Sequence, residues 1–364
     1  MRKRRHQQPW WRRVLNWVPT VAMLVYTIVL ALNRNFIPED IRIINVYLLL
    51  MGLYVVPKML FALCSAAGLV WKRLVHIRYN WGNIAAIFLI LFCWYSIIYG
   101  STLGFRKLDV RHIDLYFDDL PASFEGYKIV QFSDAHVGSF SKNGIRLLQN
   151  ALDSINAQQP DLIVFTGDLQ NLRPKELDPV QQQLAGLRAK DGVVSVLGNH
   201  DYSEYIHENP AIEAANCREI ISRERQCGWQ LLLNEHKTIY RGGDSIVIAG
   251  EENLEKPARA DFSKTMDKVD EGAFVVMLQH NPEAWEQHIK PSNRVQLTLS
   301  GHMHGGQVAL MGFRPSALKY KHDYGLFKED NKALYVASSV GALIPFRIGI
   351  SGEIAVITLH KAKS

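Results

Sequence analysis

Apolar residues are concentrated in the first hundred positions of the 364-residue chain, where they form three long segments at residues 14–32, 44–71 and 83–99. A helix needs about 20 apolar residues to cross about 30 Å of hydrocarbon, so the first and third segments, slightly extended, each suit one crossing. The second segment is long for one crossing and too short for two. We therefore expect a tilted or kinked helix there, with Pro57 at the kink.

Two features of these segments leave alternatives open. Lys58 lies near the middle of the second segment, where a charge is costly in lipid. It either faces other helices or a polar headgroup, or it snorkels beside the turn that Pro57 opens. The first segment shares a basic start with signal peptides, but its apolar run is long and lacks a clear small-x-small cleavage site. We therefore expect three membrane-spanning helices.

The formal charge of +6 has a local origin and predicts how the chain is oriented. The N-terminus carries a basic cluster without acidic residues, the loop between the second and third segments is also basic, and basic flanks stay in the cytoplasm. Three crossings then make the N-terminus cytoplasmic and the part after Gly100 extracytoplasmic, or periplasmic in a Gram-negative cell. One crossing more or fewer reverses the side. The basic residues are Arg2, Lys3, Arg4, Arg5, Arg12, Arg13, Lys72, Arg73 and Arg78.

From residue 101 the pattern changes to short apolar runs separated by segments with helical spacing. Residues 128–132, 161–165 and 193–197 are typical of buried strands and 145–157 of a helix, an order that favours a sheet flanked by helices. Six later strands predict two packed sheets with helices outside. We divide the chain into a basic tail with a three-helix anchor at 1–104 and a soluble domain at 105–364. The later strands are expected near 229–233, 245–249, 273–278, 295–299, 334–336 and 354–359.

Five polar clusters in the soluble part each follow an apolar strand directly. Ligands of α/β proteins bind at the carboxyl ends of strands, so these clusters should converge. Their carboxylate, imidazole and amide donors suit Mn, Fe, Zn or Mg rather than metals that prefer thiolates. The clusters are Ser133-Asp134-Ala135-His136, Gly167-Asp168-Leu169, Gly198-Asn199-His200-Asp201, His280-Asn281-Pro282 and Gly301-His302-Met303-His304-Gly305-Gly306.

The spacing within the clusters favours two metal ions. Asp134 and His136 can point at one ion, and His302 and His304 can face the same cavity. The two oxygens of Asp168 can bridge a pair of ions, which at about 3.5–4 Å apart would clamp a phosphoryl group. Each motif alone is weak, because a Gly-Asp pair is most often a turn and a lone histidine is most often structural. Together, in this order and each after a strand, they indicate one site.

Cysteine chemistry contributes little to this picture. Cys64 and Cys93 fall in apolar segments, where they act as small hydrophobic residues. On one straight helix Cys217 and Cys227 would be roughly 15 Å apart, too far for a disulfide. A bond between them would require the helix to break, near Gly228.

Over about residues 125–360 these motifs resemble the calcineurin-like metallophosphoesterase family. The spacing and the Gly305-Gly306-Gln307 extension are most similar to its membrane-associated branch, with YkuE-like and UDP-2,3-diacylglucosamine pyrophosphatase-like proteins. The resemblance implies a four-layer α/β/β/α sandwich and a phosphoester hydrolase with two divalent ions, Mn first and Zn, Fe or Mg as alternatives. It implies one ion held by Asp134, His136, Asp168 and His304, and a second held by Asp168, Asn199, His280 and His302, with Asp168 bridging.

On this interpretation, hydroxide activated by the metals attacks phosphorus in line. By resemblance His200 is not a ligand; it faces the phosphate and either stabilises its charge or protonates the leaving group. Asp201 is the natural partner to fix the tautomer of His200 and raise its basicity, with a turn residue as the alternative interpretation.

The motifs do not specify whether a phosphodiester, a phosphomonoester or a pyrophosphate is cleaved. Arg347 and Lys321 are candidate substrate-binding cations, with a solvated surface charge as the alternative for Lys321. The anchor favours contact with membrane lipids and a lipid-linked or membrane-proximal phosphate substrate. A basic stripe interleaved with aromatic residues, typical of nucleic-acid binding, is not found in the sequence. The alternative from another class is a catalytically weak metal-binding sensor or adaptor on the same fold.

Overall fold

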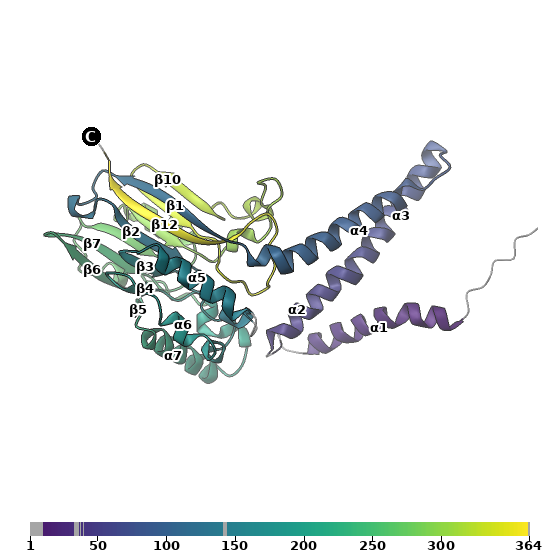
Figure 1. Ribbon diagram of the computed structural model, residues 1–364, viewed down its shortest axis with the longest axis horizontal. Helices are drawn as coiled ribbons and strands as arrows, with labels where there is room; N and C mark the ends of the chain where they lie inside the picture. Colours follow the sequence, from purple (N-terminus) through teal and green to yellow (C-terminus); the bar gives the residue numbers. More distant parts are fainter. Residues whose placement is uncertain (1–9, 33–35, 37, 39, 141–143, 363–364) are drawn as a thin grey trace, which may run out of the picture. The chain divides into compact units, whose positions relative to one another are not determined.

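The structure, a computed structural model, describes residues 10–32, 36, 38, 40–140 and 144–362 (Figure 1). Its internal contacts divide the chain into two compact units, Met1–Tyr99 and Gly100–Ser364. The described part of the first unit is helical, whereas the second combines two β-sheets with helices. The helices of the first unit are α1 (Trp10–Leu32), α2 (Ile41–Leu50), the π-helical turn η2 (Met51–Val55), α3 (Val56–Val75) and α4 (Trp81–Tyr99).

Among the residues that the structure describes, two helices are long and apolar enough to cross a membrane, judged by length and composition. They are the continuous 35-residue helix Ile41–Val75 and the 24-residue helix Trp81–Gly104. α1 contributes a shorter apolar stretch, Trp17–Leu32, since polar and charged residues occupy part of its N-terminal turns. The structure therefore supports two of the three predicted spans, and the first span stays a prediction.

The long helix is irregular directly before Pro57. Proline lacks an N–H group, so the carbonyl of Leu53, four residues earlier, loses its usual helical donor. The helix widens into the π-turn Met51–Val55, and the indole N–H of Trp94 on α4 donates to the Leu53 carbonyl at 2.9 Å. A donor from a neighbouring helix thus satisfies the group that the proline leaves open.

Lys58 contacts a neighbouring helix, as one of the two sequence interpretations expects. Its ammonium donates to the hydroxyl of Thr20 on α1, 3.0 Å away, and to the hydroxyl of Tyr54. The side chains of α1 and of the long helix therefore share a polar cluster around a charge that would be costly in lipid on its own.

The second unit contains two six-stranded sheets, ordered β1-β12-β2-β3-β4-β5 and β10-β11-β9-β8-β7-β6. In the first sheet β2, β3, β4 and β5 run parallel to one another, and in the second β7, β8, β9 and β11 do so. The strands of the first sheet are β1 (Leu108–Phe117), β2 (Tyr127–Phe132), β3 (Leu162–Phe165), β4 (Val193–Ser195), β5 (Gln230–Leu231) and β12 (Gly352–Lys361). Those of the second are β6 (Glu235–Arg241), β7 (Asp244–Gly250), β8 (Phe274–Leu278), β9 (Leu297–Ser300), β10 (Gly325–Glu329) and β11 (Lys332–Val336).

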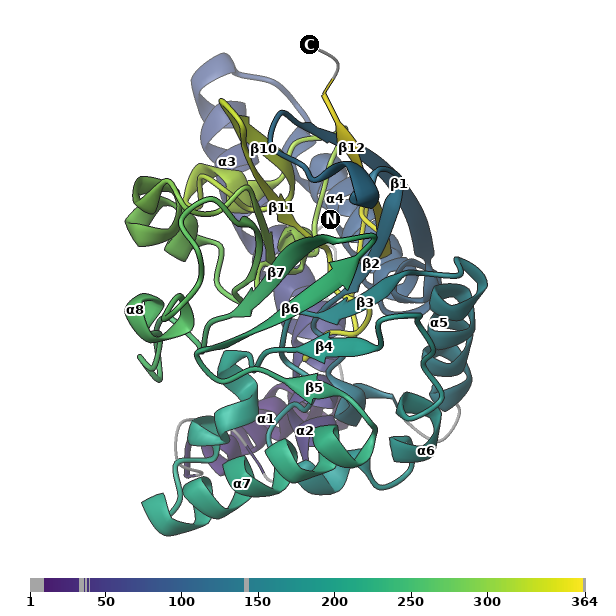
Figure 2. The same cartoon turned by 90° about the vertical axis from the view of Figure 1, so that its left-hand side faces the viewer.

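The sheets pack face to face through an apolar core, and helices cover their outer faces (Figure 2). The first sheet buries Val130, Phe132 and Phe165 against its helices, while the second buries Val275 against Trp285. Each fully buried side chain of this size contributes about 1.5–3 kcal/mol, so these layers supply a rigid support for the loops at the strand ends. The helices of this unit are α5 (Ile145–Ala157), α6 (Gln181–Leu184), α7 (Pro210–Gln226) and α8 (Phe262–Thr265).

Nine predicted strands and the predicted helix at 145–157 appear in the structure, and three further strands do not follow from the sequence pattern. These are β1, β6 and β10, which all lie at sheet edges and expose much of their length. Cys217 lies within α7 and Cys227 caps it, and both are free thiols. The helix continues past Cys217 without the break that a disulfide would need.

Candidate metal centre

The five polar clusters meet because of the strand order. β2, β3 and β4 are parallel neighbours, so the loops carrying Asp134, Asp168 and Asn199 leave the same edge of the first sheet. β8 and β9 are parallel neighbours in the second sheet, and the loops carrying His280 and His302 leave their carboxyl ends. Hydrogen bonds join the two sets, since the His302 N–H donates to the Asp134 carboxylate at 3.0 Å.

Asp168 lies between imidazoles that come from both sheets. Its Oδ2 atom is 3.3 Å from Nε2 of His280 and 3.7 Å from Nε2 of His136. Its other oxygen accepts the backbone N–H of His200 at 2.8 Å. The carboxylate is buried, so its charge interacts with these groups and is not screened by bulk water.

The remaining predicted ligands flank this carboxylate. Nε2 of His304 is 3.5 Å from Oδ1 of Asp134, and Nε2 of His280 is 3.0 Å from the side-chain oxygen of Asn199 and 3.2 Å from Nδ1 of His302. Ligand atoms lie within 4.8 Å of one another in three groups, which are Asp134, His136 and His304; His136, Asp168 and His200; and Asp168, His280 and His302.

Many of these residues have an unusual backbone conformation. Positive φ angles are uncommon outside glycine, yet Asp134, His136, Asp168, His302 and His304 have φ between 43° and 70°. Such conformations cost on the order of 1–3 kcal/mol each and persist only where the surroundings impose them. The loops are thus bent so that successive polar side chains face one place.

Two glycines allow the loops to approach this closely. A Cβ atom on Gly198 would lie 2.2 Å from Oδ1 of Asp168, and one on Gly301 would lie 1.9 Å from the hydroxyl oxygen of Ser133. Both distances are far below a van der Waals contact. The glycines in the two motifs therefore serve the close packing of the loops against Asp134 and Asp168.

The residues fit a divalent metal because several buried donor atoms lack a protein partner. Among the described residues, Oδ1 of Asp134, Nε2 of His136 and Nδ1 of His304 are buried without a hydrogen bond. An unpaired buried polar atom is costly, and a cation would satisfy lone pairs of this kind. The donor set of oxygens and imidazole nitrogens suits a hard or borderline ion.

The electrostatics keep most of these imidazoles neutral. Burial lowers the pKa of His302 to about 4 and of His304 to about 3, and it holds the pKa of His136 well below its usual range. Burial also opposes charge on His280, but the Asp168 carboxylate outweighs it and raises the pKa of His280 to about 9. Burial disfavours ionisation of Asp168 as well, yet His280 and His200 hold its pKa well below normal. Without a metal, the protonated His280 ring is the counter-ion of Asp168.

Asp201 is not the partner that fixes the tautomer of His200, and its contacts agree with the alternative interpretation of a turn residue. Asp201 is buried, and its carboxylate accepts backbone N–H groups of Asp168, Leu169, Gln170 and Gly198 at 2.8–3.2 Å. It therefore joins the loops after β3 and β4. The Nδ1–H group of His200 instead donates to the backbone carbonyl of Asn171 at 2.6 Å, and this carbonyl fixes the tautomer.

Arg347 is not accessible to a substrate, so the prediction that it binds one is also wrong. The side chain is fully buried, and its guanidinium donates to the carbonyls of Phe105, Ser339 and Gly341. Lys321, in contrast, is 72% exposed and donates to Glu286 at 2.6 Å. It lines a cavity of about 370 Å³ that also includes Met303, the residue between the two histidines of the last cluster.

Sequence patterns did not indicate several residues that orient the site. The ring of Tyr205 stacks on His200 with centroids 4.5 Å apart, and its hydroxyl accepts from the Asn199 amide at 2.9 Å. The backbone carbonyls of Asn171 and Thr166 fix His200 and His280, the latter at 2.7 Å. Backbone groups carry no residue-type signal, and Tyr205 lies in a short 3-10 turn outside any motif.

Comparison with known proteins identifies the family of this fold and site. Residues 127–306 match the calcineurin-like phosphoesterase family, and residues 1–105 match the probable calcineurin-like phosphoesterase transmembrane domain. The metallophosphoesterase YkuE of Bacillus subtilis is 31% identical over 249 residues, which cover 66% of this chain and 81% of YkuE. The chain belongs to the calcineurin-like metallophosphoesterase family.

Other relatives share the same description. A transmembrane protein with a metallophosphoesterase domain from Danio rerio is 26% identical over 73% of this chain, which spans 60% of that protein. A metallophosphoesterase from Aquifex aeolicus is 28% identical over 68% of this chain and 94% of its own length. Calcineurin-like metallophosphoesterases are metal-dependent phosphoester hydrolases, and this member is membrane-associated with a mixed α/β fold.

Proton release should accompany metal binding. His280 is protonated at neutral pH in the metal-free protein, because its pKa is about 9, and a histidine must lose this proton before it can bind a metal. The affinity for Mn²⁺ should therefore rise by up to about tenfold per pH unit between about pH 6 and 8 and level off above pH 9. Calorimetric titrations across this range, and in buffers with different heats of ionisation, measure the slope. An affinity independent of pH would contradict this assignment of the proton.

Arg347→Met should destabilise the second unit rather than weaken substrate binding. The substitution leaves three buried carbonyls without their donor, which should lower the free energy of unfolding by about 3–5 kcal/mol. Urea unfolding followed by tryptophan fluorescence measures this, with the exposed Lys321→Met as the matched control. A normal unfolding midpoint combined with a raised KM would restore the substrate-binding interpretation.

Proposed function

We propose that this metallophosphoesterase is a membrane-anchored binuclear hydrolase that cleaves a phosphodiester, phosphomonoester or pyrophosphate bond of a lipid-linked or membrane-proximal substrate. The observation that carries the proposal is the buried Asp168 carboxylate, with His136 on one side and His280 on the other. A carboxylate between two sets of ligands is the arrangement that a shared pair of cations requires. We also propose the finer architecture, a four-layer α/β/β/α sandwich behind a three-helix anchor, with domains at 1–104 and 105–364.

The distances around Asp168 support the two ligand sets that the family resemblance implies. We assign one ion to Asp134, His136, Asp168 and His304, and a second to Asp168, Asn199, His280 and His302. Mn is our first choice of metal, with Zn, Fe or Mg as alternatives, because all four accept such oxygen and nitrogen donors. When bound, such ions neutralise phosphoryl oxygens and lower the pKa of a water molecule that attacks phosphorus.

The protein side chains supply orientation and proton transfer. His280 donates through Nδ1 to the Thr166 carbonyl, which directs its Nε2 toward Asp168. His200 is held in the same way at the Asn171 carbonyl, so its Nε2 is left to stabilise the phosphate or to protonate the leaving oxygen. Stacking on Tyr205 fixes the plane of the His200 ring. Asp201 acts through the loops that it joins rather than on the proton of His200.

The proposed substrate side of the site carries cationic side chains and adjoins the metal loops. Lys319, Lys321 and His322 line the cavity that Pro282 and Met303 also border, and both of these lie within two residues of proposed ligands. We keep Lys321 as a proposed substrate contact. Its exposed ammonium now pairs with Glu286 and could bind an anionic group of the substrate instead. Membrane lipids are the proposed partners, and we propose no nucleic-acid substrate.

Hydrolysis of bis-p-nitrophenyl phosphate by the purified full-length protein with Mn²⁺ tests the proposal. Asp168→Ala should abolish turnover and reduce bound metal, whereas His200→Ala should lower kcat by about 10²–10⁴-fold with metal content retained. The exposed His112→Ala on β1 is the matched control. If the wild-type protein hydrolyses no bis-p-nitrophenyl phosphate with any divalent metal, the sensor or adaptor function would be supported instead.

The side of the membrane is a separate proposal that depends on the number of crossings. We propose a cytoplasmic N-terminus and an extracytoplasmic catalytic domain, which require α1 to cross as well as the two longer helices. The transmembrane family matched at residues 1–105 has a name that specifies four transmembrane segments, and an even number would reverse the side.

An alkaline phosphatase fusion at Ser364 should therefore be active and a green fluorescent protein fusion dark. Both proteins report the compartment of the C-terminus, because the first folds outside the cytoplasm and the second inside. The opposite pair of results would place the catalytic domain in the cytoplasm and overturn the three-crossing topology.

A further inference from the structure

A small turn in the second unit exposes apolar side chains without an evident folding role. Leu310 and Phe313 pair across it by two backbone hydrogen bonds of 2.9 and 3.0 Å, and both central residues, Met311 and Gly312, have positive φ. Turns of this kind favour Asn-Gly, because asparagine and glycine tolerate positive φ. Met311 is instead fully solvent-exposed, and Phe313 is 54% exposed. Neither the turn geometry nor the core explains an apolar residue here.

The apolar turn is tied to the end of the last membrane-spanning candidate helix through one loop. The N–H of Ala309 donates to the carbonyl of Ile348, and the side chain of Gln307 donates to the carbonyls of Ile344 and Phe346. The same loop, residues 344–349, binds Gly100, because the Arg347 N–H donates to its carbonyl at 3.0 Å.

Gly100 belongs to the apolar helix Trp81–Gly104, which is long enough to cross a membrane. The ring of Phe346 packs against it so closely that a Cβ atom there would lie 2.4 Å from a ring carbon. The turn is thus two contacts away from a helix that is long and apolar enough to cross a bilayer, and Ile344, which lies between them, is 40% exposed.

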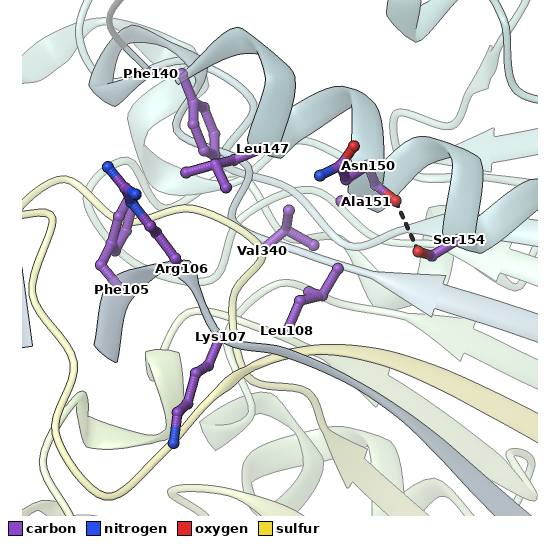
Figure 3. A pocket seen from close by; sticks show the side chains of 10 residues that line it. All are labelled: Phe105, Arg106, Lys107, Leu108, Phe140, Leu147, Asn150, Ala151, Ser154 and Val340. Carbon is purple, nitrogen blue, oxygen red and sulfur yellow. Dashed lines mark hydrogen bonds between the residues drawn. The ribbon is translucent and has the colours of Figure 1, made fainter. Parts of the chain in front are cut away.

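A basic groove adjoins this loop. Pro345 of the loop lines one of two neighbouring cavities, of about 370 and 240 Å³. Both cavities are lined by Phe105, Arg106, Phe140, Leu147 and Asn150. Figure 3 shows Arg106 and Lys107 as neighbours in the lining of the smaller cavity, with their side chains pointing in different directions, together with the apolar side chains of Phe105, Leu147 and Val340. Arg146 adds a third cation, and none of the described residues lining the two cavities is acidic.

This combination suits the surface of an anionic bilayer. Exposed apolar side chains insert at the boundary between headgroups and acyl chains, and neighbouring cations attract anionic headgroups. We propose that Leu310, Met311, Phe313 and Ile344, with Arg106, Lys107 and Arg146, form an interfacial surface that docks the catalytic unit on the bilayer. The occupant is a phospholipid membrane with anionic headgroups, the same membrane that the α4 helix enters.

Residues close in sequence to the interfacial surface lie on, or contact, the loops of the proposed metal ligands. Gln307 follows His304 by three residues, and the N–H groups of Val340 and Gly341 donate to the carbonyls of Ser133 and Asp134 at 3.0 and 2.9 Å. Docking would therefore hold the site beside the headgroup layer. Resting on the proposed function, this names the substrate class as a phosphate ester carried by a membrane lipid and reached without leaving the bilayer.

Fluorescence of full-length protein in nanodiscs tests the docking directly. Met311→Cys, in a background in which the four native cysteines are replaced by serine, carries an environment-sensitive NBD label, and nitroxide-labelled phospholipid is the quencher. Tyr240→Cys on β6 is the matched control, because Tyr240 is 78% exposed on the second sheet. The label at position 311 should emit further to the blue and be quenched by nitroxide lipid about threefold more than the label at 240.

Equal quenching by aqueous iodide at both positions would overturn the docking proposal.

Measurements of activity then separate the docking proposal from the proposed function. In the double variant Met311→Gln, Phe313→Gln, the ratio of kcat/KM for vesicle-borne phosphatidic acid to that for bis-p-nitrophenyl phosphate should fall about tenfold. An unchanged ratio would overturn the lipid substrate class, whereas a wild-type protein inactive on both substrates would overturn the hydrolase function and leave the labelling result standing.

Discussion

The site depends on where one carboxylate is held. Asp168 lies at the end of β3, and two backbone groups fix it there. Its own N–H donates to Asp201, and its Oδ1 accepts the N–H of His200, so the loops after β3 and β4 are joined through it. The second sheet approaches from the other side and brings His280 within 3.3 Å. A buried anion between the two sheets needs positive charge, which a proton on His280 supplies in the absence of metal and a pair of cations would supply more completely.

The rest of the fold offsets the energetic cost of this arrangement. Residues such as Asp134 and His302 adopt backbone conformations that cost on the order of 1–3 kcal/mol each, and they do so on loops that are closely packed through glycines. The large core between the sheets and the helix layers outside them hold the strand ends rigid against that strain. Burial in the core therefore offsets the backbone strain in the loops. The strained loops in turn hold donors such as Nε2 of His136 without a protein partner.

The sequence predicted the interior of this molecule better than its edges. Central strands such as β3 and β8 are continuous apolar runs, and their predicted bounds agree with the structure within a residue or two. The strands β1, β6 and β10 are sheet edges whose side chains are mostly exposed or half-buried, so they lack a continuous apolar run. The candidate ligands could be found because each follows a central strand. Roles that depend on burial could not, since a sequence does not show that Arg347 is enclosed by carbonyls or that Asp201 faces backbone amides. Tyr205 was missed for the same reason, because its contact with His200 exists only in the folded loops.

The helices of the first unit and the metal loops of the second would belong to one function if the substrate is a lipid. The most direct test of the central claim is to locate the metal ions at this centre. Crystals of the protein grown with Mn²⁺ should give two anomalous scattering peaks about 3.5–4 Å apart, with the Asp168 carboxylate contacting both. A single peak, or density in which Asp168 and the surrounding imidazoles bind no ion, would contradict the binuclear site from which the proposed hydrolysis follows.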